Sequence, residues 1–338
     1  MPDCAVIDLE GGALTPAFGD GHAHPQFGGL EDVGPRIRPC RSVDEIVAEV
    51  KRWAAAHPAE PWIIGASYDA TLAPAGVFDR RWLDAAVPDR PVVLRAWDYH
   101  TVWANSAALE RAGITRETPD PPLGRIVRDG SGHPVGTLRE TGAVELVMQH
   151  APSYPLNVRV EALRRASRAF LDQGTTWVQE AWVDEGDVDG WIAAAEQGAL
   201  EIRFNLAFRA DPLQWRAQEA LFRATRDRIA ALSTPMLSAR TVKFFVDGVI
   251  ENGTAALLDG YGHDVAAEGL ANWSDRALAD AAIAFDAAGF QLHFHAIGDA
   301  AARSSLDAIA AAEERNGARD RRPVIAHVQL IDDADITR

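Results

Sequence analysis

Cysteine is nearly absent from this chain of 338 residues, which contains only Cys4 and Cys40. Two cysteines cannot build the disulfide framework that holds small secreted proteins together. The N-terminus also lacks the order of basic residues followed by an apolar run that marks a secretion signal. These two absences favour the cytoplasm as the location of the protein.

Long apolar runs and an excess of positive charge are missing too. No uninterrupted apolar stretch approaches the roughly 18–20 residues that span a bilayer. The 49 acidic residues outnumber the 33 basic ones and give a formal net charge of −16, which repels a phosphate backbone. We therefore expect neither a membrane nor a nucleic acid as a partner. A small-molecule substrate is expected, and a homodimer is left open as the assembly.

What the sequence does contain is an alternation of short apolar runs with longer segments of helical periodicity. The short runs are rich in Val, Ile and Phe, and this βα rhythm predicts an α/β fold with parallel strands. Six strands are predicted, at Ala17–His24, Thr175–Trp182, Glu201–Phe208, Val242–Asp247, Gln291–Ile297 and Val324–Gln329.

A long interruption separates the first two of these strands. It contains its own strand-like runs, Trp62–Ser67 and Pro91–Trp97, and then a stretch rich in Pro, Gly and Asp at Thr118–Gly136. The pattern predicts an inserted α/β subdomain over residues 56–155, with the barrel built from residues 16–55 and 156–338. Because the chain begins almost on a strand and stops soon after its sixth, we expect a fragment of a longer protein.

Histidines stand at the ends of three predicted strands. His22 and His24 are two residues apart, so in a strand both imidazoles point to one face and can converge on one ion. Polar residues at a junction between strand and loop are the alternative interpretation. His295 and His327 end two further strands, and active sites of βα barrels lie at that end. All four histidines are predicted metal ligands.

Three other polar residues lie where apolar ones are expected. Lys243, inside an apolar strand, must be paired or neutral. A neutral lysine can react with carbon dioxide to give a carbamate that bridges two divalent ions, whereas an ordinary salt bridge is the alternative. His293 shares a face with His295 but lies one layer deeper, and it is predicted to be a packed or hydrogen-bonded imidazole behind the metal ligands. Glu180 ends the second strand and is predicted to orient a ligand histidine, with direct metal contact as its alternative.

These features together resemble the amidohydrolase superfamily, and within it the amidohydrolase 3 group of YtcJ-like enzymes and N-substituted formamide deformylases. The resemblance covers nearly the whole chain, and the order and spacing of the matching pieces are more specific than any one of them. The pieces are Pro16–His24, Arg95–Ser106, Gly136–Glu140, Val242–Gly248, Thr254–Leu257, His295–Asp299 and His327–Gln329.

The resemblance implies a TIM-like (β/α) barrel of the metal-dependent hydrolases and a set of site residues. The implied metal ligands are His22, His24, Lys243, His295 and His327, and the catalytic residues are Lys243 and His100. His100 would face the substrate over the metal pocket, with a plain loop histidine as the alternative. One or two Zn²⁺ ions are expected, with Mn²⁺ or Fe²⁺ as alternatives. The implied reaction is hydrolysis of non-peptide C–N bonds, in N-acyl or N-formyl amides, by metal-activated water.

The sequence departs from the family at both ends. The family uses an aspartate at its eighth strand to bind metal and move a proton, and Asp332, Asp333 and Asp335 follow the sixth strand too closely for that position. We therefore expect about six of eight strands, with residues 1–15 as the remnant of a small β domain. Unpaired first and last strands would make the 338-residue chain self-associate and hydrolyse poorly. The alternatives are an inactive metal-binding or interaction protein, or a barrel whose histidines are structural.

Overall fold

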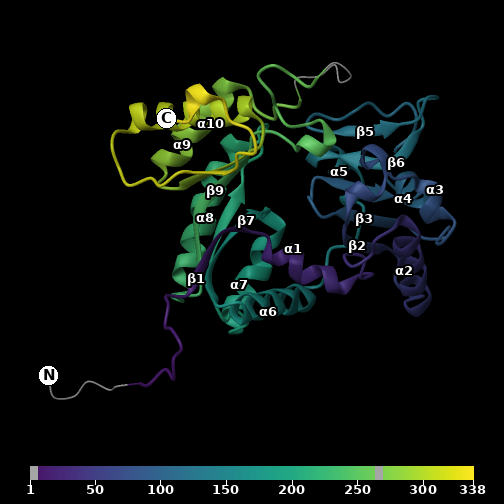
Figure 1. Ribbon diagram of the computed structural model, residues 1–338, viewed down its shortest axis with the longest axis horizontal. Coiled ribbons are helices and arrows are strands. Elements are labelled where there is room, and N and C mark those ends of the chain that lie inside the picture. The colour runs from purple at the N-terminus through teal and green to yellow at the C-terminus, as the bar shows by residue number, and fades with distance from the viewer. Residues whose placement is uncertain (1–6, 263–268) are drawn as a thin grey trace.

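The computed structural model describes residues 7–262 and 269–338, which form two β-sheets side by side (Figure 1). The larger sheet has the strand order β1-β7-β8-β9-β10-β11, and all neighbours in it are parallel. Its strands are β1 (Phe18–Ala23), β7 (Thr175–Val183), β8 (Arg203–Arg209), β9 (Leu237–Phe245), β10 (Gln291–Ala296) and β11 (Val324–His327). Each overlaps one of the six predicted strands.

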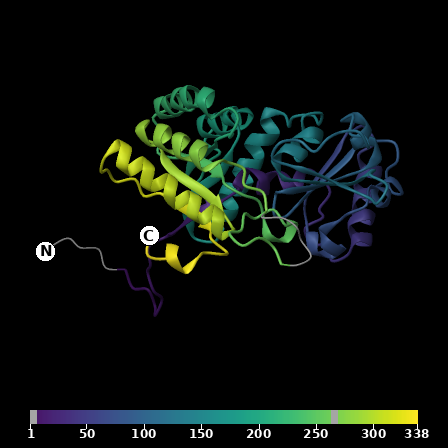
Figure 2. The same cartoon turned by 90° about the horizontal axis from the view of Figure 1, so that it is seen from above.

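Helices connect these strands because parallel neighbours require a crossover. They lie outside the larger sheet, as the two perpendicular views show (Figures 1 and 2). They are α6 (Leu156–Asp172), α7 (Val188–Glu196), α8 (Trp215–Ala231), α9 (Asp275–Ala287) and α10 (Asp299–Asn316). Each helix has a buried apolar face toward the strands, which accounts for the period of the sequence pattern.

The packing between sheet and helices determines which residues face the barrel interior. Phe244 of β9 and Phe294 of β10 are stacked with ring centroids 5.0 Å apart, and Phe285 of α9 lies 6.0 Å from Phe244. Successive side chains of a strand point to opposite faces. Since Phe244 and Phe294 face the helices, their neighbours Lys243 and His295 face inward.

The larger sheet is an incomplete barrel. In the part of the chain that the structure describes, β1 pairs only with β7 and β11 pairs only with β10. The predicted fold class is confirmed: a TIM-like α/β barrel with about six strands and an α/β insertion after the first.

The smaller sheet is mixed, with the order β2-β3-β4-β6-β5, and only β2 and β3 in it are parallel. Its strands are β2 (Ile63–Tyr68), β3 (Val92–Ala96), β4 (Thr101–Ala104), β5 (Arg125–Arg128) and β6 (Pro134–Arg139). The α-helices between β1 and α6 are α1 (Pro25–Leu30), α2 (Val43–Ala56), α3 (Arg80–Asp84), α4 (Ser106–Arg111) and α5 (Glu140–Met148). Separate apolar cores form on its two faces.

The domain boundaries stay a prediction. The smaller sheet lies within residues 56–155, but α2, from the part assigned to the barrel, packs its Ile46 and Val50 against that sheet. The stretch rich in Pro, Gly and Asp contains β5 and the start of β6. Residues 7–15 of the expected β-domain remnant contain no strand, and the rest of that remnant, with Cys4, lies outside the described residues.

A search of the described helices for membrane-spanning candidates found none that combines sufficient length with sufficient apolar character.

Candidate metal centre and active site

Imidazoles from β1, β10 and β11 meet at the C-terminal ends of the barrel strands. The ring centroid of His22 lies 5.3 Å from that of His24 and 4.7 Å from that of His327. The ring centroid of His295 lies 4.6 Å from that of His327. All four rings line one cavity of about 410 Å³. The structure thus brings together the four histidines that the strand pattern selected, at the end of the barrel where such folds place their sites.

Lys243 points into the same interior from β9 and is fully buried. Its Nζ has no hydrogen-bonding partner among the described residues, and lies 5.1 Å from the centroid of the Phe245 ring. Burial lowers the pKa of Lys243 well below its ordinary value, and the charge of Glu180 opposes this only in part. The described residues therefore do not provide the salt bridge that was the alternative, and the burial of Lys243 favours its neutral form.

The same burial keeps the imidazoles neutral. Burial, and then the charge of Lys243, lowers the pKa of His24 to about 3 and that of His327 to about 4. Burial is also the largest cause that lowers the pKa of His22 and that of His295, both well below their ordinary value. Neutral imidazoles have a lone pair, which metal coordination requires.

The donor set fits a divalent ion by its chemistry: four neutral imidazoles line one cavity, and the unpartnered amine of Lys243 is buried in the same barrel interior without lining that cavity. Across residues 7–262 and 269–338, however, no group of three or more His, Cys, Asp or Glu side chains is already arranged to hold a metal ion. The assignment of these side chains as metal ligands therefore stays a prediction.

The two predicted supporting residues contact ligand candidates directly. Glu180 Oε1 lies 3.3 Å from His24 Nδ1, and its two oxygens accept the backbone N–H groups of Gln26 and Trp182. Burial raises the pKa of Glu180 to about 8, although those two hydrogen bonds oppose the shift. His293 Nε2 and His22 Nδ1 share a hydrogen bond of 2.9 Å. Contacts of this kind fix the ring orientation and the tautomer of a ligand.

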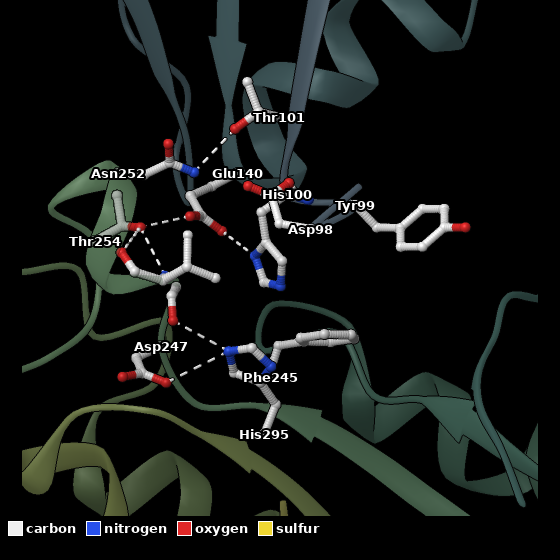
Figure 3. A network of polar contacts seen from close by, with 12 residues as sticks. Asp98, Tyr99, His100, Thr101, Glu140, Phe245, Asp247, Asn252, Thr254 and His295 are labelled. Carbon is white, nitrogen blue, oxygen red and sulfur yellow. Dashed lines mark hydrogen bonds and ion pairs between the residues drawn. The ribbon is translucent and has the colours of Figure 1, made fainter. Parts of the chain in front are cut away.

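The insertion contributes His100 to the site (Figure 3). The His100 ring lies 4.9 Å from the His295 ring, and its Nδ1 is 2.7 Å from Glu140 Oε2. Thr254 donates its hydroxyl to the other oxygen of Glu140 at 2.6 Å. Burial alone lowers the pKa of His100, but the charges of Glu140 and Asp98 raise it above its ordinary value. His100 therefore lies beside the neutral histidines, lines the same cavity and has a carboxylate partner. Its substrate-facing role stays a prediction.

His295 is positioned from the opposite side by the end of β9. Its Nε2 lies 3.1 Å from the carbonyl oxygen of Gly248 and 3.7 Å from Asp247 Oδ1. Asp247 is fully buried and accepts the backbone N–H groups of Ala256, Ile297 and Gly298. This carboxylate, drawn beside His295 in Figure 3, thus ties the chain after β9 to the chain after β10. Val249 and Ile297 of these two segments line the cavity.

Three residues of the site have an unusual backbone. Tyr99, Glu140 and His327 adopt positive φ angles of 63°, 64° and 77°. Non-glycine residues rarely take this left-handed conformation, and it persists where surrounding contacts hold it, often at functional sites. Here it occurs at Tyr99, which precedes His100 in the chain, at Glu140, which contacts His100, and at His327, the last residue of β11.

Comparison with known proteins shows the family to which this chain belongs. Residues 5–338 match the model of the Amidohydrolase family. The chain belongs to this family. It is 30% identical to YtcJ of Bacillus subtilis over 339 residues, which is 100% of this chain and 62% of YtcJ. It is 28% identical to an N-substituted formamide deformylase of Arthrobacter pascens, over 94% of this chain and 59% of the deformylase.

Solved structures show that the family's fold extends over this chain. The match to an uncharacterized metal-dependent hydrolase from Pyrococcus horikoshii has a TM-score of 0.65 at 21% identity. It covers 95% of this chain and 60% of the hydrolase chain. The match to an uncharacterized metal-dependent hydrolase from Pyrococcus furiosus has a TM-score of 0.64 at 23% identity. It covers 95% of this chain and 62% of the hydrolase chain. The chain thus spans about three fifths of the length of YtcJ, the deformylase and both solved structures.

Two residues of this amidohydrolase site were not assigned a role from the sequence. Glu140 and Asp247 both occur in the pieces that carry the family resemblance, but neither piece has a metal-ligand spacing. A usable signal was present for Asp247, because a carboxylate directly after an apolar strand needs hydrogen-bond donors when buried. For Glu140 the partner His100 is distant in sequence, and only the pairing of β4 with β6 brings them together.

Proposed function

We propose that this chain forms the catalytic barrel of a metal-dependent hydrolase that cleaves C–N bonds other than peptide bonds, with N-formyl or N-acyl amines as substrates. One observation carries the proposal: four neutral imidazoles line one cavity at the strand ends. A buried lysine without a hydrogen-bonding partner among the described residues lies in the same barrel interior. The similarity to a formamide deformylase supports the substrate class. A cytoplasmic location, consistent with the scarcity of cysteine, is part of the proposal.

In this proposal His22, His24, His295 and His327 hold the metal together with Lys243. Zn²⁺ suits imidazole donors best, and Mn²⁺ or Fe²⁺ are the alternatives. A divalent ion bound there would acidify water to a nucleophile near neutral pH and polarise the substrate carbonyl. Glu180 and His293 keep the His24 and His22 rings in place through the contacts described above.

Lys243 is proposed to act as a carbamate. Its neutral amine can attack the carbon of carbon dioxide, forming an N–C bond, while the nitrogen releases a proton to solvent. The product carries a negative charge and two oxygens among the imidazoles, where the neutral amine offers only one nitrogen donor.

His100 is proposed to handle the substrate's proton and charge. Since Glu140 engages Nδ1, the opposite nitrogen, Nε2, remains for the cavity. A protonated Nε2 can donate a hydrogen bond to the carbonyl oxygen as negative charge develops there, or a proton to the leaving nitrogen. The aromatic rings of Trp182 and Phe245, 4.6 Å apart, form an apolar wall that suits an aryl or alkyl substituent.

Metal removal tests this function. The purified chain is analysed for bound metal and assayed for formate release from N-benzylformamide and for acid release from N-acyl benzylamines. We expect stoichiometric metal, loss of turnover after chelation, and its recovery with added Zn²⁺. Protein that takes up no metal, or activity that a chelator leaves unchanged, would contradict the proposal and favour a barrel with structural histidines.

Replacing Glu140 with glutamine is expected to lower kcat by about 10- to 100-fold, the range for partners that orient catalytic groups. The reason is that the amide no longer holds the charge and the tautomer of His100. Metal content and KM should change little, because Glu140 contacts no ligand candidate. Glu145→Gln, on the exposed side of α5, is the control. Equal losses of kcat and metal in Glu140→Gln would show that Glu140 only maintains the fold.

A further inference from the structure

A second cavity of about 180 Å³ adjoins the histidine cavity. Tyr99 lines both cavities. The rings of Phe27 and Tyr99 are stacked 4.9 Å apart, and they lie 6.0 Å and 5.8 Å from the His24 ring. The second cavity therefore begins where this aromatic pair meets the candidate metal centre.

The walls of the second cavity are mainly apolar and come from both parts of the molecule. Phe27 and Leu30 belong to α1 beside the barrel, while Ile64, Val93 and Met148 belong to the insertion. A cavity of roughly 150 Å³ is enough for a benzene ring. The space thus fits one aromatic ring or a short alkyl group.

One guanidinium lines this apolar space with few partners. Arg95 of β3 donates one hydrogen bond, from Nη1 to the Tyr99 carbonyl at 3.0 Å, and its Cζ lies 5.5 Å from the Phe27 ring centroid. Among the described residues it has no other hydrogen bond and no ion pair within 4.0 Å. Arginine has five N–H donors in a fixed fork, so most of this recognition capacity is left for a ligand.

The carboxylates near Arg95 are already engaged elsewhere. Glu31 accepts two hydrogen bonds from Arg38, at 2.7 and 2.5 Å, and one each from Ser67 and Tyr99. Asp187 accepts from Gln26 and from the backbone of Asp184. Arg38 balances the charge of Glu31. Burial, the main cause, raises the pKa of Asp187 to about 6. Burial lowers the pKa of Arg95, and the charges of Tyr99, Asp184 and Asp98 oppose this. Asp184 is paired with Arg209, and Asp98 accepts the backbone N–H of His100. Among the described residues, the guanidinium of Arg95 therefore has no carboxylate within ion-pair distance.

We propose that the second cavity binds an aryl or alkyl group that carries a carboxylate, with Arg95 as the anion-binding residue. The carboxylate would take the bidentate contact that a guanidinium offers, and the apolar walls would enclose the stem. In the proposed hydrolase this group is the non-reacting end of the substrate, so that part of the inference rests on the proposed function. Binding of the carboxylate itself does not depend on hydrolysis.

Binding is tested first with matched ligands on the full chain. Phenylacetate and its neutral isostere phenylacetamide are titrated calorimetrically into the wild type, Arg95→Met and Arg164→Met. Arg164 lies on the exposed side of α6 and gives the same change of net charge. We expect the wild type and Arg164→Met to bind phenylacetate about 10-fold more tightly than the amide, as a charge-assisted pair provides. Arg95→Met should lose this preference while its affinity for phenylacetamide stays the same.

Hydrolysis then separates this inference from the proposed function. N-formyl-4-(aminomethyl)benzoate and N-formylbenzylamine are compared, and kcat/KM should favour the anionic amide about 10-fold in the wild type only. If neither amide is hydrolysed but the phenylacetate preference depends on Arg95, the function fails and the subsite stands. Equal binding of both ligands by the wild type, or a preference that survives in Arg95→Met, overturns the subsite. Should Arg95→Met not fold, Arg95→Gln, which keeps a donor for the Tyr99 carbonyl, is interpreted in the same way.

Discussion

Replacing His22 or His24 with alanine is expected to remove the bound divalent ion and to lower kcat/KM by about 1,000-fold or more. The estimate follows from the several kcal/mol of charge stabilisation that a catalytic metal supplies, at about 1.4 kcal/mol for each factor of ten. Both imidazoles line the cavity, and neutral rings at that position are the donors a metal needs. Elemental analysis of the purified variants, together with kcat/KM, measures the two effects separately.

His293→Ala is the matched comparison for these two variants. His293 does not line the cavity but shares a hydrogen bond with His22, so its loss should weaken metal binding by about 10- to 100-fold only. His133, in an exposed turn of the insertion, provides a surface control. Equal metal loss in His293→Ala and His22→Ala would mean that the deeper imidazole is itself a ligand.

Replacing Lys243 with alanine is expected to have a comparable effect, with a loss of metal and a fall in activity of about 1,000-fold. The physical reason is that the proposed carbamate supplies the negative charge of an otherwise neutral ligand set. The substitution also leaves a space next to the imidazoles, because Lys243 is among the large, fully buried side chains. Added acetate or formate should enter that space, replace the missing oxygens and restore part of the activity.

Lys243→Met is the control for this rescue. Methionine fills the volume of the lysine stem, so short carboxylates should find no room and activity should not return. Mass spectrometry of the intact wild type under carbon dioxide would detect the added mass of the carbamate. If the methionine variant retains both metal and turnover, Lys243 is not part of the metal set, and its burial needs another explanation.

The period of the sequence pattern was sufficient to locate the barrel strands and to select the histidines. Strand alternation places His22 and His24 on one face, and a lysine between Val242 and Phe244 is conspicuous because a charge there would be buried. These inferences depend only on neighbours in the chain, and the structure places the side chains in one interior. Their roles as metal ligands stay a prediction.

The sequence pattern was less informative about which element each helix or strand packs against. The apolar face of α2 is evident from its spacing, yet the sequence does not specify whether that face packs on the barrel or on the smaller sheet, and it packs on the smaller one. β5 and the start of β6 lie in a stretch whose Pro, Gly and Asp content indicates a loop. Their strand conformation comes from pairing with neighbours, which is a tertiary effect on local preference.

The sequence by itself therefore determined the α/β barrel and the four histidines, because strand period and residue type are local properties of the chain. Only the tertiary structure decided how His100 is held. Antiparallel pairing of Thr101 with Arg139 sets Glu140 beside His100, since the residues that flank a paired position also become neighbours. The contact of Tyr99 with both cavities, and with it the placement of Arg95, follows from the packing of the insertion on the barrel. Such contacts join residues far apart in sequence, and no local pattern encodes them.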